Sequence, residues 1–134
     1  KVTFLQQLVR RLDLAGIEVI QGRAEEVARW PELREAYDLV LARAVAHLAV
    51  VAEYGLPFLR LGGRLIAPKG EDASAEAHAS GPALQALGGR LVTIKLVELP
   101  GLAGQRHLVV VDKSEHTPER YPRRTGIPAK RPLL

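Results

Sequence analysis

An arginine interrupts a long apolar run in the first half of the chain. Between Leu39 and Val51 every residue is apolar except Arg43 and His47. A buried guanidinium is costly unless a carboxylate pairs with it, or unless water or a ligand reaches it. Arg43 is therefore expected either at the end of a buried strand or in a binding site.

Further charged residues follow predicted strands. Gly22–Glu26, "GRAEE", comes directly after one of them. A carboxylate in such a loop can accept hydrogen bonds from the ribose or amine of a nucleotide-like cofactor. Glu25 or Glu26 can equally be a carboxylate in the first turn of a helix, where the helix dipole favours it, and either can be the partner of Arg43. Lys69 ends another strand and is expected to be exposed, facing an anionic substrate.

Basic residues gather near the C-terminus of a chain whose net charge is +4. Basic side chains beside an aromatic one, here Tyr121, are the combination that proteins use to contact RNA. A solvated, solubilising extension is an equal alternative. The candidate RNA contacts, including two residues at predicted strand ends, are Lys69, Arg106, Arg123, Arg124, Lys130 and Arg131.

Several other chemistries lack their residues. The 134 residues contain no cysteine, which excludes disulfides, cysteine-ligated zinc and a cysteine nucleophile among them. There is no GxSxG or GxxxxGK[ST] motif and no complete GxGxxG. The four histidines do not have metal-ligand spacing, so we expect no metal site. No apolar run approaches the roughly 18 residues of a membrane span, and no secretory leader is visible, so we expect a cytoplasmic protein.

Alternating helical and strand patterns predict an α/β fold. A Leu/Val-rich run from Tyr37 suits a parallel strand that is covered on both faces. The short link between the last two strands favours antiparallel pairing. The predicted order is helix 1–15 closed by Gly16, strand 17–22, a short helix within 23–30, strand 37–43, helix 46–63 ended by Gly62-Gly63, strand 64–70, one or two helices within 71–89 closed by Gly88-Gly89, and strands 90–100 and 106–113.

Two consequences follow for the organisation of the chain. Residues 1–113 are expected to form the α/β domain, and 114–134, with four prolines, a basic and irregular tail. Ligands of open α/β sheets bind beyond the carboxyl ends of the strands. Residues 22–26, 42–46 and 68–71 are therefore expected to share one rim, which is the candidate site.

The start of the chain is unusual. Lys1 lies within a predicted helix, and the sequence contains no methionine. We expect the chain to be the C-terminal part of a longer protein, or a chain that lacks its first half.

Six segments, taken in order, resemble a known family. They are "KVTFLQQL", "GRAEE", "LARAVAHL", "GLPFLRLGGRLIAPKG", "RHLVVVDK" and "YPRRTGIPAKRPL". Together they resemble the C-terminal two thirds of the 16S ribosomal RNA guanine-N7 methyltransferase family, also called glucose-inhibited division protein B. "RAVAHL" and "YPRRTGIPAKRPL" are the specific parts, and the resemblance covers essentially the whole chain.

The resemblance implies a fold, a reaction and a site. The fold would be that of a class I S-adenosylmethionine-dependent methyltransferase, which is Rossmann-like, with a mostly parallel sheet that ends in an antiparallel hairpin. The reaction would methylate N7 of one guanine in the decoding-region loop of 16S rRNA, so the partner would be this RNA or the small ribosomal subunit. Ala24, Glu25 and Arg43 would contact S-adenosylmethionine. The full-length protein would be a monomer.

The chain also departs from the family pattern. The Gly-rich cofactor loop and the acidic end of the second strand have no counterpart in the 134 residues. In the family the first two strands lie between the third and the fourth, so 17–21 and 37–42 would not be neighbours, and apolar edges would be exposed. We therefore predict that the 134-residue chain binds S-adenosylmethionine poorly or not at all and is inactive alone. Isothermal titration that gave micromolar affinity would contradict this.

Guanine N7 carries a lone pair and no proton, so methyl transfer to it requires positioning and a suitable electrostatic field but no general base. We accordingly predict no catalytic acid or base.

Two other interpretations stay open. One is a non-catalytic α/β RNA-binding or interaction domain that uses the basic tail, and a weaker one is a nucleotide-binding oxidoreductase domain.

Overall fold

From Tyr37 to Val97 strands and helices alternate along the chain, as the sequence predicts. The computed structural model describes residues 1–43 and 46–134. In this part of the chain one mixed sheet has the strand order β1-β2-β4-β3. β1 runs parallel to β2, while β4 runs antiparallel to both of its neighbours. The strands are β1 (Tyr37–Leu41), β2 (Leu59–Lys69), β3 (Gly89–Val97) and β4 (Arg106–Lys113).

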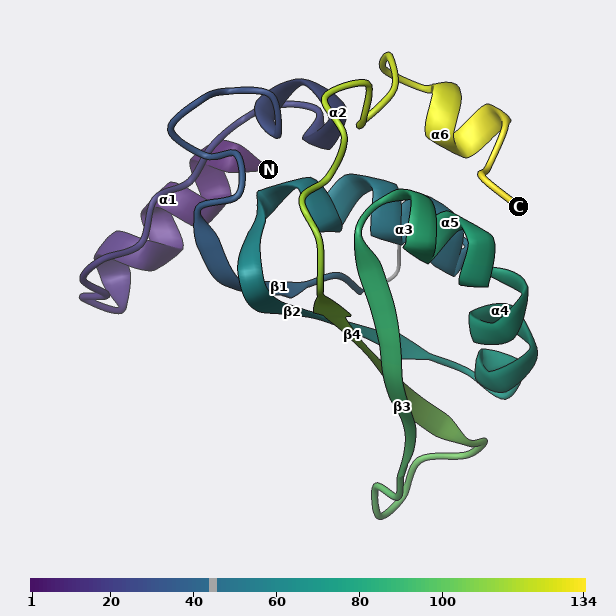
Figure 1. The fold of residues 1–134 in the computed structure, drawn as a ribbon. Helices are drawn as coiled ribbons and strands as arrows, with labels where there is room; N and C mark the ends of the chain where they lie inside the picture. Colours follow the sequence, from purple (N-terminus) through teal and green to yellow (C-terminus); the bar gives the residue numbers. More distant parts are fainter. Residues whose placement is uncertain (44–45) are drawn as a thin grey trace.

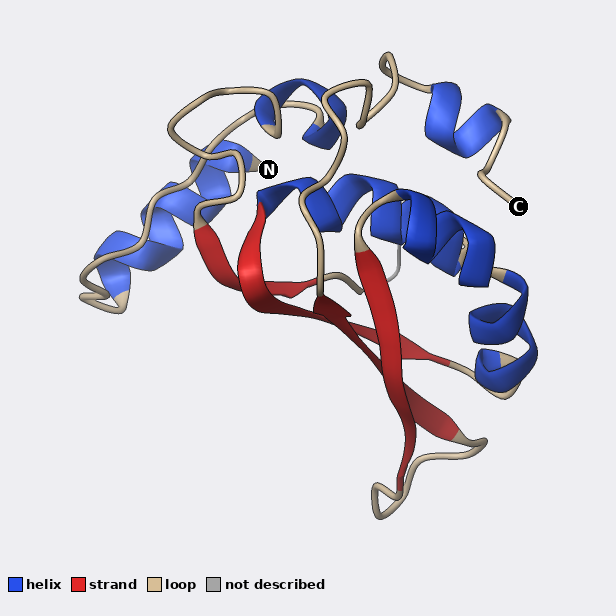
Figure 2. Cartoon of the chain, viewed as in Figure 1, coloured by secondary structure: helices blue, strands red, loops and turns tan. Residues whose placement is uncertain are grey.

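One face of the sheet is covered by the helices α3, α4 and α5 (Figures 1 and 2). The far end of the β3–β4 hairpin projects beyond this helical layer. The helices are α1 (Val2–Arg11), α2 (Ala24–Val27), α3 (Leu48–Gly55), α4 (Ala73–Ala79), α5 (Gly81–Ala86) and α6 (Ile127–Lys130), with a 3-10 turn, η1 (Leu56–Phe58).

Alternation along the central strands builds the core. Leu65 and Ala67 of β2 are fully buried, as are Val109 and Val111 of β4, and all belong to one hydrophobic cluster with the helices. Successive side chains of a strand point to opposite faces. The intervening residues therefore face away from the cluster, and Arg64 forms a 2.6 Å ion pair with Asp112 there. The strand pattern thus fixes which face of the sheet the helices cover.

β1 is less covered than its composition predicts. The expectation of a strand buried on both faces is wrong for the described residues, since Leu39 is 49% exposed and Leu41 is 69% exposed. The reason is position, because β1 lies at one end of the described sheet order and pairs only with β2 there. An apolar strand in this place leaves an edge unpaired, and most proteins avoid such an edge.

One predicted strand and the end of one predicted helix are also wrong. Residues 17–22 form no strand, because no described segment supplies the ladder of hydrogen bonds that a strand needs. The helix predicted to reach Gly62-Gly63 ends at Gly55, and β2 already begins at Leu59. The glycine pair instead lies inside β2, at the shift of register against β1, where Gly62 has a φ of +79°.

The tail after β4 packs against the rest of the chain. Arg34 holds it through the backbone carbonyl oxygens of Thr117 and Tyr121, at 2.9 and 3.0 Å. Gly88, with a φ of +81°, packs so closely below it that an added Cβ would lie 2.2 Å from the backbone oxygen of Glu115. Thr117 and Tyr121 are buried. The tail is therefore neither a solvated extension nor wholly irregular, since it also contains α6.

Candidate functional site

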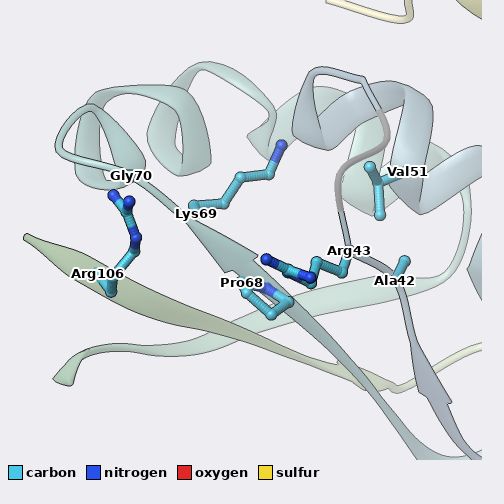
Figure 3. A pocket seen from close by; sticks show the side chains of 7 residues that line it. All are labelled: Ala42, Arg43, Val51, Pro68, Lys69, Gly70 and Arg106. Atoms are coloured by element: carbon cyan, nitrogen blue, oxygen red, sulfur yellow. The ribbon is translucent and has the colours of Figure 1, made fainter. Parts of the chain in front are cut away.

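Two of the three predicted rim segments meet in one pocket. The carboxyl ends of the parallel strands β1 and β2 lie side by side, and residues that follow or end them line a pocket of about 360 Å³ (Figure 3). We call this the rim pocket. Its lining comprises Ala42, Arg43, Val51, Pro68, Lys69, Gly70 and Arg106. Of the predicted segment 42–46, residues 44 and 45 lie outside the described part of the chain.

The third rim segment, 22–26, lies apart from this pocket. Ala24 begins α2, and Glu25 stands in its first turn with only 3% of its surface exposed. The backbone N–H of Gly126 donates to Glu25 Oε1 at 2.9 Å, and Arg23 lies 3.5 Å from the same oxygen. The first-turn position agrees with the helix-dipole interpretation of this carboxylate. Burial raises the pKa of Glu25, but the hydrogen bonds and Arg23 outweigh this effect and lower the pKa below its usual value.

The expected pairing of Arg43 with Glu25 or Glu26 is not found among the described residues, where Glu25 pairs with Arg23 and Glu26 accepts from the Thr125 hydroxyl. Arg43 is exposed and its side chain lines the rim pocket, which Glu25 does not line. The cofactor residues implied by the resemblance thus divide into two groups, with Ala24 and Glu25 under the tail and Arg43 at the strand ends. Their role as cofactor contacts stays a prediction.

Lys69 is less exposed than predicted. Its ammonium donates to the backbone oxygen of Ala46 at 2.7 Å and to Glu76 Oε1 at 2.6 Å, and only 14% of its side chain is exposed. The same carboxylate accepts the backbone N–H of Leu48, the first residue of α3. Lys69 therefore links β2 to the loop after β1 and to α4.

The tail cations differ in their surroundings. Arg123 is half-buried, and its guanidinium pairs with the carboxylate of Glu53, a fully buried residue of α3. Arg124, Lys130 and Arg131 are exposed, as is Arg106 at the start of β4. Arg123 thus has a structural partner, whereas the exposed cations present their charge to solvent.

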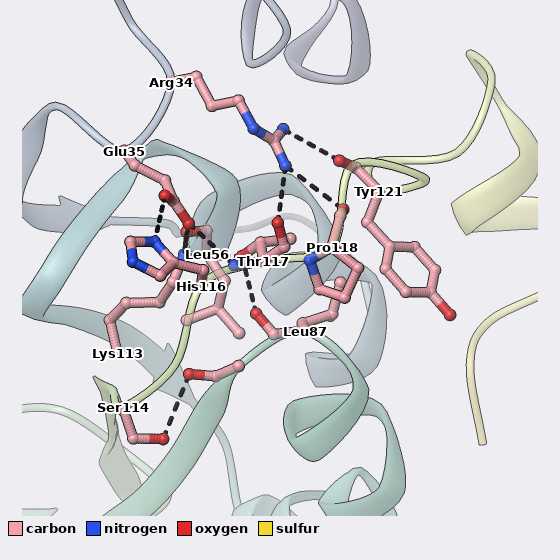
Figure 4. A network of polar contacts seen from close by, with 11 residues as sticks. Arg34, Glu35, Leu56, Leu87, Lys113, Ser114, His116, Thr117, Pro118 and Tyr121 are labelled. Atoms are coloured by element: carbon pink, nitrogen blue, oxygen red, sulfur yellow. Dashed lines mark hydrogen bonds and ion pairs between the residues drawn. The ribbon is translucent and has the colours of Figure 1, made fainter.

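A buried polar network behind the tail was not anticipated from the sequence (Figure 4). Lys113 is fully buried, and its ammonium donates to Leu56 O at 2.7 Å and to Thr117 Oγ1 at 2.6 Å, and lies 3.1 Å from Glu35 Oε1. Glu35 also accepts from the Thr117 backbone N–H at 2.8 Å and contacts His116 at 2.7 Å. One signal was present, because Lys113 continues the inward alternation of Val109 and Val111.

Glu35 should make the stability of the fold depend on acid pH. Burial raises its pKa, but the contacts from His116, Thr117 and Lys113 prevail and lower it from 4.5 to about 2. Because the folded pKa lies below the unfolded one, the stabilisation is complete above pH 4.5 and is lost as the pH falls towards 2. The expected loss is about 3 kcal/mol.

Urea unfolding at several pH values measures this effect. Glu35→Gln should flatten the curve between pH 4.5 and 2, while the exposed Glu115→Gln should follow the unmodified chain. Equal acid sensitivity of the Glu35→Gln variant and the unmodified chain would contradict the assignment of the effect to this carboxylate.

Comparison with solved structures gives the fold class. The structure is similar to that of TYW2 from M. jannaschii, solved in complex with AdoMet, with a TM-score of 0.60 and 18% identity over 86% of this chain and 53% of that chain. It is also similar to an SAM-dependent O-methyltransferase from Thermotoga maritima, with a TM-score of 0.52 and 11% identity over 87% of this chain and 47% of that one. The chain has the α/β fold of the S-adenosylmethionine-dependent methyltransferases.

Sequence comparison gives the family. The family model described as GidB, rRNA small subunit methyltransferase G, matches residues 1–109, and the chain belongs to this family. Proteins named ribosomal RNA small subunit methyltransferase G from Roseiflexus castenholzii and Dehalococcoides mccartyi are 50% and 47% identical over all 134 residues. The chain covers 57% of each, so it spans little more than half the length of these relatives.

Among the described residues, no helix is long and apolar enough to cross a membrane.

Proposed function

We propose that the chain is part of an enzyme that transfers a methyl group from S-adenosylmethionine to N7 of a guanine in 16S rRNA. Membership of the family described as rRNA small subunit methyltransferase G is the observation that carries this proposal. The names of the relatives and the methyltransferase fold support it. The substrate is a component of the small ribosomal subunit, so the proposed place of action is the cytoplasm.

The residues proposed to contact the cofactor lie in two separate places. Glu25 keeps an ionised carboxylate, which suits a hydrogen-bond acceptor for a nucleoside, but its position is buried beside Gly126. Arg43 lies in the rim pocket instead. Glu25 is not among the residues that line the rim pocket, and we assign no reaction step to the cofactor from this geometry.

The lining of the rim pocket suits the proposed acceptor. N7 of guanine has a lone pair and requires no base, and the residues within 1–43 and 46–134 that line this pocket include no carboxylate or histidine. Positioning of the base is then the main contribution of the protein, since orientation alone can account for a large part of a rate enhancement.

A second candidate is a domain that binds RNA without catalysis. The exposed cations of the tail, Arg124, Lys130 and Arg131, favour it, because they would act on any RNA backbone. The two proposals differ in whether the chain is required for the formation of 7-methylguanine. Mass spectrometry of the nucleosides of 16S rRNA, with and without the gene that encodes this chain, distinguishes them by the presence of 7-methylguanine.

A further inference from the structure

The tail passes beside α2, the short helix that carries Ala24 and Glu25 (Figure 1). The backbone N–H of Gly126 donates to Glu25 Oε1 at 2.9 Å, and the Thr125 hydroxyl donates to Glu26 Oε1 at 2.7 Å. Two consecutive residues of the tail thus bind two consecutive carboxylates of α2.

The tail is itself fixed to the rest of the fold just before these contacts. The guanidinium of Arg123 pairs at 2.7 Å with the carboxylate of Glu53, which is fully buried in α3. Arg29, two residues after α2, donates to the backbone oxygen of Pro122. The tail therefore links α2 to α3.

The position of α2 depends on such links. Isolated helices shorter than about 12 residues are marginal in water, and α2 has only four residues. Apolar packing holds one side of it, where Val27 and the following Ala28 are buried. On the other side Glu25 is buried, and its charge adds to burial in raising the pKa of Tyr54 in α3. A buried carboxylate needs its hydrogen-bond donors, and the tail supplies one of them.

We propose that Thr125 and Gly126 are positioning residues of the cofactor site, which hold Ala24 and Glu25 in place without contacting S-adenosylmethionine themselves. This inference rests on the proposed function, in which α2 supplies cofactor contacts. Groups that bind a ligand gain affinity when other contacts already hold them in the bound arrangement, because less freedom is lost on binding. The tail then has a function that its basic residues alone do not explain.

The test measures the affinity for S-adenosylmethionine, by isothermal titration, of the complete product of the gene that encodes this chain. Thr125→Val keeps the shape of the side chain but removes the hydroxyl donor to Glu26, and should weaken cofactor binding by about threefold to tenfold. Thr125→Ser keeps the donor and should bind like the unmodified protein. Arg60→Ala removes a comparable exposed contact, with Asp38, in which the tail takes no part, and should leave the affinity unchanged.

A double variant tests whether the two side chains act as a pair. Glu26→Met removes the acceptor of the Thr125 hydroxyl, so it should weaken cofactor binding as much as Thr125→Val does. The two changes together should weaken it no more than either change alone, because both break the same hydrogen bond.

Hydrogen exchange measures whether α2 itself is loosened, and it requires no cofactor. The amides of Val27 and Ala28, which make the hydrogen bonds of α2, should exchange faster in Thr125→Val than in the unmodified protein. The amide of Leu84 in α5 should exchange at the same rate in both proteins, because α5 lies outside these contacts with the tail.

Several results would overturn this inference. They are equal cofactor affinity of Thr125→Val and the unmodified protein, an equal loss of affinity in Thr125→Ser or Arg60→Ala, and unchanged exchange of the α2 amides in Thr125→Val. An unmodified protein that binds no S-adenosylmethionine would instead contradict the proposed function, so the two failures are distinguishable.

Discussion

Replacement of Arg123 by alanine is expected to lower the free energy of unfolding by about 3–5 kcal/mol. Glu53 is fully buried in α3, and its carboxylate receives Arg123 Nη2 at 2.7 Å, Arg123 Nε at 2.9 Å and the Arg123 backbone N–H at 2.8 Å. Removal of the guanidinium leaves a buried carboxylate with only the backbone contact, and an unpaired buried charge is strongly destabilising. Urea unfolding followed by circular dichroism measures the change.

The residue next to Arg123 provides a matched control. Arg124 is exposed, so Arg124→Ala should change the free energy of unfolding by no more than about 0.5 kcal/mol. Adding Glu53→Leu to Arg123→Ala should recover much of the loss, because the uncompensated charge is then gone. If Arg123→Ala were as stable as Arg124→Ala, the ion pair would not anchor the tail as described.

This pair also changes the interpretation of the basic tail. Sequence alone places Arg123 among equivalent candidate RNA contacts, because it has the same charge as Arg124 and lies next to it in the same basic segment. The structure separates the two residues by their partners, since only Arg123 reaches Glu53, 70 positions earlier in the chain. Contacts between residues so far apart in the sequence leave no local pattern from which they could be predicted.

The parts of the fold that sequence predicts well are those with local signals. The strands β3 and β4 and their antiparallel pairing follow from two apolar runs and a short link, and α4 and α5 follow from helical spacing and a closing Gly88. The wrong prediction of a strand at residues 17–22 has another cause. Residues 17–22 have a strand-like pattern, but a strand exists only with a partner, and the pattern contains no information on whether one is present.

Only part of the candidate site was predicted from the sequence. The rule that ligands bind beyond strand ends brought residues 42–43 and 68–70 together, because it depends only on parallel pairing. Burial of Lys69 was not foreseen, since its partner Glu76 lies on a separate helix. The network of Lys113 and Glu35 was missed because it joins segments 78 positions apart, although the strand alternation places Lys113 on the inward face.

The largest effect concerns the RNA itself. If the chain belongs to an enzyme that methylates guanine N7, deletion of the gene that encodes it should remove 7-methylguanine from the targeted position of 16S rRNA completely. Uncatalysed methylation of N7 is too slow to fill one position of the RNA, because orientation of donor and acceptor supplies a large part of the rate. A plasmid copy of the gene should restore the modification.

The proposed methyl transfer is therefore tested by nucleoside mass spectrometry of digested 16S rRNA fragments from the deletion strain, the parent strain and the complemented strain. The proposed function predicts 7-methylguanine at one position in the parent and complemented strains, and its absence from the deletion strain. Persistence of the modification at full level after deletion would contradict the proposed function and leave the non-catalytic RNA-binding domain as the better interpretation.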